Sequence, residues 1–154
     1  MTYTAETLPA SSIYEVLDES WSEYSGSIPK PRFFDIGGTG RSLRVDLDRF
    51  LGSAGERDLV LIRASTLEET PIGNWTYVNR TGRIEVEVYS KAGRQRLYDV
   101  MQEIRRILHL HRHSVEGYQR VRFVSFTEYA EENFNIWIGQ ITVEATNSAV
   151  VAEV

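Results

Sequence analysis

The second half of the chain most constrains the fold, because residues 81–146 predict a strand, a long helix and two further strands with short connections. In the first strand, Ile84, Val86 and Val88 alternate with charged residues, which is the period of a half-buried strand. Over about residues 94–111, one stripe at helical spacing collects the apolar residues Leu97, Val100, Met101, Ile104, Ile107 and Leu108. Strand patterns follow at residues 118–129 and 134–145, and Gly139 inside the last one indicates a bulge or close packing. We expect an α+β fold, in which a small mixed or antiparallel sheet carries the long amphipathic helix on one face.

The first half predicts an additional N-terminal helix, whose apolar residues recur at helical intervals at Ile13, Val16, Leu17, Trp21 and Tyr24. Ser12 and Glu15 have the spacing of a capping box and predict its start. Phe33, Phe34 and Ile36 predict a short strand, and the compact apolar run at residues 59–62 predicts a buried one. Residues 65–73 are polar and acidic and contain Pro71, so we expect them to form a loop that reaches out from the sheet.

The length of 154 residues fits a single domain, and 42% hydrophobic residues suffice for a core. We divide it into an N-terminal helix and extension that pack on the core (residues 1–57), the core itself (58–146) and a short C-terminal tail (147–154). A net charge of −5 argues against a general nucleic-acid binder. The chain has no cysteine, and we find neither a signal-peptide pattern nor an apolar run long enough to cross a bilayer.

Several patterns resemble catalytic or metal sites, and each has a simpler explanation. His109, His111 and His113 fall where the long helix is expected to end, and no carboxylate or cysteine is placed beside them, so we expect solvated histidines that complement the helix dipole. The glycine-rich run at residues 37–42 lacks the lysine and the spacing of a phosphate loop. The carboxylate pairs 68/69 and 131/132 lie in polar segments, and no serine has a nucleophile-elbow sequence. We therefore expect no catalytic, cofactor or metal site.

The expected helix also carries a basic face with Arg94, Arg96, Arg105, Arg106 and Arg112. One interpretation is a solvated surface with local ion pairs to neighbouring carboxylates. The other is a contact between subunits, since arginine and aromatic side chains such as Trp75, Tyr77, Tyr129 and Trp137 dominate interface energetics. The sequence leaves both open.

Two segments, GRIEVEVYS at residues 82–90 and GRQRLYDVMQEIRRILH at 93–109, resemble the tail terminator and tail-completion proteins of long-tailed viruses. The strand VRFVSF at residues 121–126 and the pattern WIGQITV at 137–143 are also similar to that family. The resemblance covers about residues 58–146, whereas the first 57 residues match no pattern of the family.

The resemblance implies a structural virion protein, assembled in the host cytoplasm, that forms a ring of probably six copies at the head-proximal end of the tail. Such a ring ends tail-tube growth and joins the tail to the head, so its partners are further copies of itself, the tail tube protein and a neck or head-completion protein. DNA passes through its lumen without specific binding, and no membrane is involved. Two alternatives remain: a head-completion or neck adaptor that binds the portal, and a small ligand-binding α/β module.

We expect the contacts between subunits to come from protruding elements, the loop at residues 65–77 and the turn at 37–43, together with the basic helix face. The candidate contact residues are Arg41, Leu67, Glu68, Glu69, Trp75, Tyr77, Arg94 and Arg105.

Overall fold

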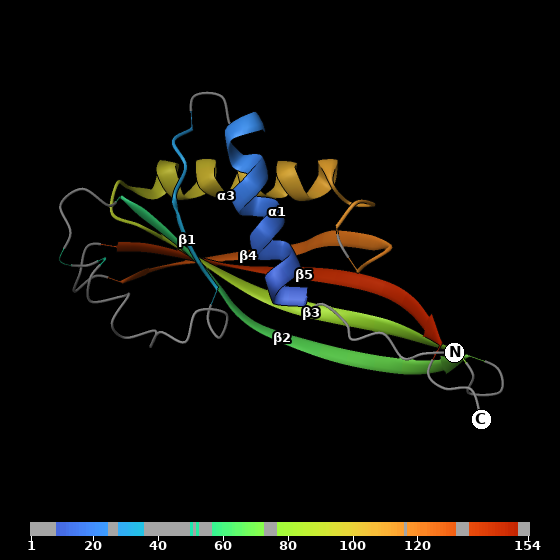
Figure 1. Cartoon of the computed structure of the whole chain (residues 1–154). Coiled ribbons are helices and arrows are strands. Elements are labelled where there is room, and N and C mark those ends of the chain that lie inside the picture. The colour runs from blue at the N-terminus through green and yellow to red at the C-terminus, as the bar shows by residue number, and fades with distance from the viewer. Residues whose placement is uncertain are drawn as a thin grey trace.

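The computed structural model describes residues 9–24, 28–35, 50, 52, 57–72, 77–115, 117–131 and 136–150. The elements follow in the order α1 (Pro9–Tyr24), β1 (Arg32–Asp35), β2 (Asp58–Ile72), β3 (Tyr77–Ser90), α3 (Arg94–Leu110), β4 (Arg120–Glu131) and β5 (Ile136–Val150). The described strands form one five-stranded sheet in the order β1-β2-β3-β5-β4 (Figure 1). The α+β class is confirmed.

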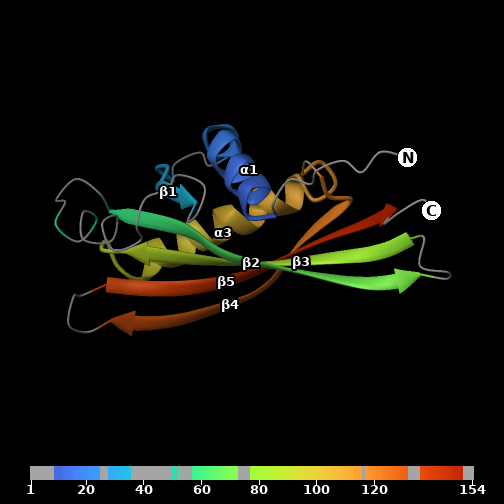
Figure 2. The ribbon, with the colours of Figure 1, turned by 60° about the horizontal axis from the view of Figure 1, so that its bottom comes forward.

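The sheet is mixed, because β1 pairs with β2 in parallel while β2, β3, β5 and β4 pair antiparallel in turn. Both helices lie on the same face of the sheet (Figure 2). The register shifts once between Ile62 and Ala64 in β2 and once between Phe123 and Ser125 in β4, so each of these strands contains a bulge or irregularity. β2 and β4 occupy opposite sides of the four-stranded antiparallel part, which leaves most of their outer edges without a described strand partner.

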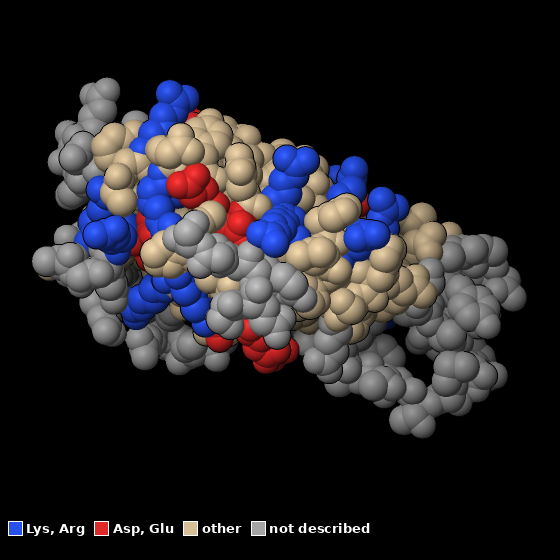
Figure 3. Space-filling view, turned by 90° about the horizontal axis from the view of Figure 1, so that it is seen from above, with Lys and Arg blue, Asp and Glu red and all other residues tan. Residues whose placement is uncertain are grey.

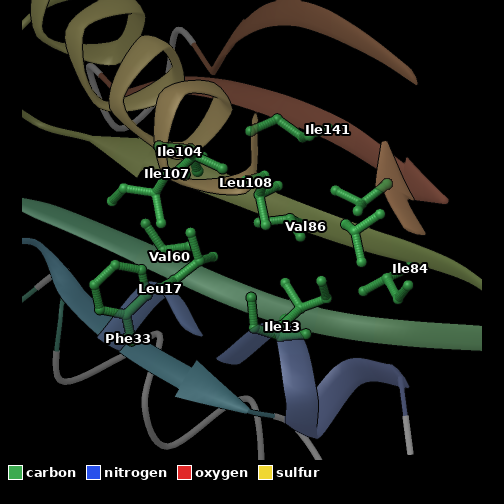
Figure 4. Packing of buried hydrophobic residues seen from close by; sticks show 14 of the residues in the cluster. Ile13, Leu17, Phe33, Val60, Ile84, Val86, Ile104, Ile107, Leu108 and Ile141 are labelled. Atoms are coloured by element: carbon green, nitrogen blue, oxygen red, sulfur yellow. The ribbon is translucent and has the colours of Figure 1, made fainter. Parts of the chain in front are cut away.

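The core lies between the sheet and the two helices (Figure 4). The apolar stripe of α3 faces the strands, and Ile104, Ile107 and Leu108 are fully buried against Val86 and Ile141. Each such side chain contributes about 1.5–3 kcal/mol when it leaves water, so this contact supplies much of the driving force for folding. The helix also buries Glu103, a charged residue that the apolar stripe of the sequence does not include.

The first helix, α1, packs against α3 and the near strands through Ile13, Leu17 and Trp21, all of which are buried. The Trp21 ring meets Phe33 edge to face, and its Nε1 donates to the carbonyl of Ile28 at 3.2 Å. The predicted capping box is wrong, because the helix begins at Pro9 and Ser12 is buried within it. Proline is favoured in the first turn, where its missing N–H costs nothing.

A buried polar cluster joins the start of α3 to the sheet. Both Nε and Nη2 of Arg96 lie 2.7 Å from Oδ2 of Asp58. The other carboxylate oxygen of Asp58 accepts a hydrogen bond of 2.8 Å from Ser90, and Arg96 also donates to the Pro29 carbonyl at 2.7 Å. These bonds fix α3, β2, β3 and the segment before β1 relative to one another.

The strands are longer than their hydrophobic patterns predict. The predicted loop at residues 65–73 is wrong for its described part, because β2 continues to Ile72 and pairs with β3 as far as Tyr77. Likewise β5 continues to Val150 opposite Tyr77, so the expected end of the core at residue 146 falls within a strand. The reason is that a long neighbouring strand supplies backbone partners whether or not the side chains alternate. The ends of β2, β3 and β5 project beyond both helices, and we call residues 66–72, 77–83 and 144–150 the arm (Figures 1 and 2).

Gly139 shows the close packing that its position in β5 predicts. A Cβ atom at this residue would lie 2.3 Å from Cε2 of Phe126, so any larger residue would require that ring to move. The predicted turn at residues 37–43 lies outside the described residues. Within the described ranges, no helix combines the length and apolar character needed to span a bilayer.

Candidate functional site: an arginine-lined groove between α3 and β4

A groove of about 750 Å³ runs between the second half of α3 and the beginning of β4. Its lining includes the guanidinium groups of Arg105, Arg106, Arg112, Arg120 and Arg122, with His109 beside them. A smaller hollow of about 160 Å³ adjoins it, lined by Arg120, Arg122, Glu144 and Thr146. Seen from the helical side, the described surface carries several groups of Lys and Arg and fewer Asp and Glu side chains (Figure 3). This is an unusual concentration of positive charge in a chain whose net charge is −5.

Local sequence explains why these arginines are exposed. In α3 the positions that face the sheet are taken by Ile104, Ile107 and Leu108, so Arg105 and Arg106 are exposed. In β4 the alternation places Val121 inside and Arg120 and Arg122 outside. The backbone N–H of Val121 donates to the carbonyl of Arg112 at 2.8 Å, which holds the turn after α3 against the beginning of β4.

Glu103 gives the groove a buried carboxylate. Glu103 is only 7% exposed, and its Oε1 lies 3.5 Å from Nη1 of Arg106. The second oxygen, Oε2, is buried and accepts no hydrogen bond from any described residue. A buried acceptor at the wall of a groove takes its donor from outside the described residues, from water or from a bound partner.

The positive groups are only partly neutralised within the chain. Arg122 lies 3.5 Å from Glu144, a weak contact at an exposed guanidinium. Of the ion pairs between described residues, none involves Arg105 or Arg120. Guanidinium groups bind carboxylates and phosphates through paired hydrogen bonds, so the groove is suited to hold an anionic group.

The histidines near this groove do not meet at one point. His109 lines the groove, whereas Nδ1 of His113 lies 3.3 Å from the carbonyl of Gln119 and Nδ1 of His111 lies 3.3 Å from the hydroxyl of Ser114. The helix ends at Leu110, so the four-residue spacing no longer places His109 and His113 on one face. Among the described residues, no three His, Cys, Asp or Glu side chains form a group that could hold a metal ion.

The candidate contact residues lie on three separate surfaces. Three of them, Leu67, Glu68 and Glu69, belong to β2 in the arm and are exposed. Glu69 forms an ion pair with Arg80, in which Oε1 of Glu69 lies 2.6 Å from Nε of Arg80. Arg105 lies in the groove, whereas Arg94 is at the other end of α3 and pairs with Glu128 at 2.7 Å. Tyr77 begins β3, but its side chain is outside the description, and Arg41 and Trp75 lie outside the described residues.

Two pKa shifts reflect these surroundings. A hydrogen bond to Tyr98 and then the charge of Glu128 raise the pKa of Arg94, so this guanidinium stays charged at every accessible pH. Burial raises the pKa of Tyr118 above its ordinary value, an effect that the positive charge of Arg80 partly offsets.

Sequence reasoning missed Glu103, Arg120 and Arg122 as members of the site. The alternation of arginine with buried residues at the start of β4 was the available signal for the two arginines. Nothing local marked Glu103, because its burial depends on β4 lying beside α3.

No protein-family model matches the sequence, and no curated protein matches it either. In fold, the chain is similar to a chain of a solved structure described as the virion of a native gene transfer agent particle. The similarity has a TM-score of 0.65 at 8% sequence identity and covers 92% of this chain and 96% of that chain. At this identity, the likeness shows a shared fold.

Proposed function

We propose that this chain is a structural virion protein that forms a ring at the head-proximal end of a tail, ends growth of the tail tube and joins the tail to the head. The observation that carries the proposal is the fold likeness to a chain of a phage-like particle over almost the whole of both chains. The sequence resemblance over residues 58–146 points to the same class of particle and supplies the more specific role.

The surfaces of the molecule are suited to such a role. A ring built from identical copies needs two different contact surfaces on each copy, one that meets the copy before it and one that meets the copy after it. The groove beside β4 and the β2 part of the arm, residues 66–72, lie toward opposite edges of the sheet. In this proposal the function depends on copies that bind one another through surfaces of complementary shape and charge, and no covalent bond is made or broken.

In this proposal the ring contacts the tail tube protein on one side and a neck or head-completion protein on the other. Tube growth stops because only one of these two ring surfaces matches a further layer of tube protein. DNA passes through the lumen without being held, which fits a chain whose net charge is −5.

Tail length in particles made without this chain tests the proposal. We expect overlong tails of variable length, because nothing then ends tube growth, and we expect the intact chain supplied in trans to restore a uniform length. Finished tails of normal length beside unjoined heads would refute the terminator role and indicate a neck adaptor. Electron microscopy of negatively stained particles measures both outcomes directly.

A further inference from the structure

The groove has two unmet requirements that restrict what can occupy it. Its arginines attract negative groups, and the buried Oε2 of Glu103 lacks a hydrogen-bond donor among the described residues. A DNA backbone offers only acceptors to such a site, whereas an acidic polypeptide segment offers carboxylates and also backbone N–H donors. The combination therefore favours an acidic segment of protein over a phosphate backbone.

This chain carries a segment of that kind in the arm. Residues 66–71 of β2 are all exposed, and they include Glu68 next to Leu67, which is 44% exposed. β1 covers the outer edge of β2 only opposite residues 59–62, and no described strand pairs with that edge farther along. Since alternate residues of an edge strand point their N–H groups away from the sheet, the segment presents the carboxylate of Glu68, N–H donors without a described strand partner and one apolar side chain together.

The segment 66–71 of a copy lies too far from its own groove to fill it. β3 and β5 separate β2 from β4, which places the two outer strands roughly 14 Å apart. Across the sheet, Glu68 is level with Thr81, Thr146 and finally Arg120, so the same row ends in a carboxylate on one edge and a guanidinium on the other. Copies placed side by side would bring these opposite ends together.

We propose that the arginine-lined groove receives the acidic segment 66–71 of β2 from a second copy of this chain. The carboxylate of Glu68 faces Arg105 and Arg120, and an N–H of the incoming strand edge supplies the donor that Glu103 lacks. This inference rests on the proposed function, because it names the contact that closes the ring.

A charge exchange between two variants tests the contact. One variant carries Glu68→Arg, and the other carries Arg105→Glu together with Arg120→Glu. Each alone places like charges at every contact, so we expect the mass measured by light scattering to fall to that of a monomer and the dissociation constant to rise about 100-fold or more. An equimolar mixture offers an opposite charge at both kinds of contact, and we expect it to recover the oligomer with alternating copies.

Matched controls separate this effect from misfolding and from net charge. Glu19→Arg makes the same charge change at an exposed position of α1, and Arg105→Lys with Arg120→Lys keeps the charge of the groove. Both are expected to assemble like the unaltered chain, and circular dichroism establishes that all variants are folded.

Three results would overturn the contact: variants that assemble like the unaltered chain, a mixture of the two that stays monomeric, or an unaltered chain that is monomeric at every concentration. None of them bears on tail length, so failure of this contact is distinguishable from failure of the proposed function. An oligomer that dissociates on either reversal and returns only in the mixture supports it.

Discussion

Replacement of Gly139 by alanine tests the packing between α3 and the sheet at its tightest described point. A Cβ atom at this position would lie 2.3 and 2.7 Å from two ring carbons of Phe126 and 3.4 Å from Cδ1 of Leu97. The ring has to move, which disturbs its edge-to-face contact with Tyr98, where the ring centroids are 5.5 Å apart. The substitution therefore disturbs one defined aromatic contact without removing an atom from the core.

The expected cost follows from three contributions. Overpacking of a well-packed site costs about 1–3 kcal/mol, and loss of an aromatic pair costs about 0.5–1.5 kcal/mol. Alanine loses less backbone entropy than glycine in a strand, which returns about 0.5–1 kcal/mol. We expect the free energy of unfolding to fall by about 2 kcal/mol, and the melting temperature of a chain of this size to fall by about 4–8 °C.

Urea and thermal unfolding followed by circular dichroism measure this loss. Gly52→Ala serves as the control, because nothing lies within 4 Å of the added atom and little change is expected. In a chain that already carries Phe126→Ala, the ring is gone and Gly139→Ala should cost close to nothing. Equal losses in both backgrounds, or no loss in the intact chain, would refute the argument.

Three further predictions concern other contacts. Leu17→Ala should lower the free energy of unfolding by about 3 kcal/mol in chemical denaturation, because Leu17 is fully buried between α1 and the sheet; a loss below about 0.5 kcal/mol would mean that α1 does not belong to this core. Arg96→Met should cost about 3–5 kcal/mol in urea, because it leaves the carboxylate of Asp58 buried with only Ser90 as partner, whereas Arg57→Met at an exposed position should cost little. Because burial raises the pKa of Tyr118 above 10.0, its contribution to stability is present below that pH and is lost as the pH rises through the higher, folded-state pKa; Tyr118→Phe should therefore flatten the fall in stability above pH 10 in urea titrations, and an unchanged slope would contradict the shift.

The parts of the fold that could be predicted are those in which local periodicity and burial agree. The apolar stripe of the long helix predicted residues 94–111, and α3 spans Arg94–Leu110. The compact run at residues 59–62 is fully buried in β2, as predicted. In α3 one face must leave water, and at residues 59–62 both faces of the strand must, so the spacing of apolar residues carries the information in each case.

The arm could not be predicted in the same way. Residues 66–71 are exposed on both faces of the sheet, so their side chains show no alternation, and Pro71 with adjacent acidic residues is typical of a loop. They form a strand because β3 continues beside them and supplies backbone hydrogen-bond partners. Side-chain patterns do not report such pairing.

The sequence by itself determined which apolar residues of the long helix and of residues 59–62 are buried, where that helix lies, and that Gly139 is closely packed, because each of these follows from side chains and their neighbours in the chain. Only the tertiary structure decided that Arg105 and Arg120, fifteen residues apart in number, share one groove with a buried Glu103. Charge on a helix looks the same in sequence whether it faces solvent or a neighbouring strand. Because β4 packs beside α3, arginines from separate parts of the sequence line one positively charged groove, and the groove also contains the buried Oε2 of Glu103.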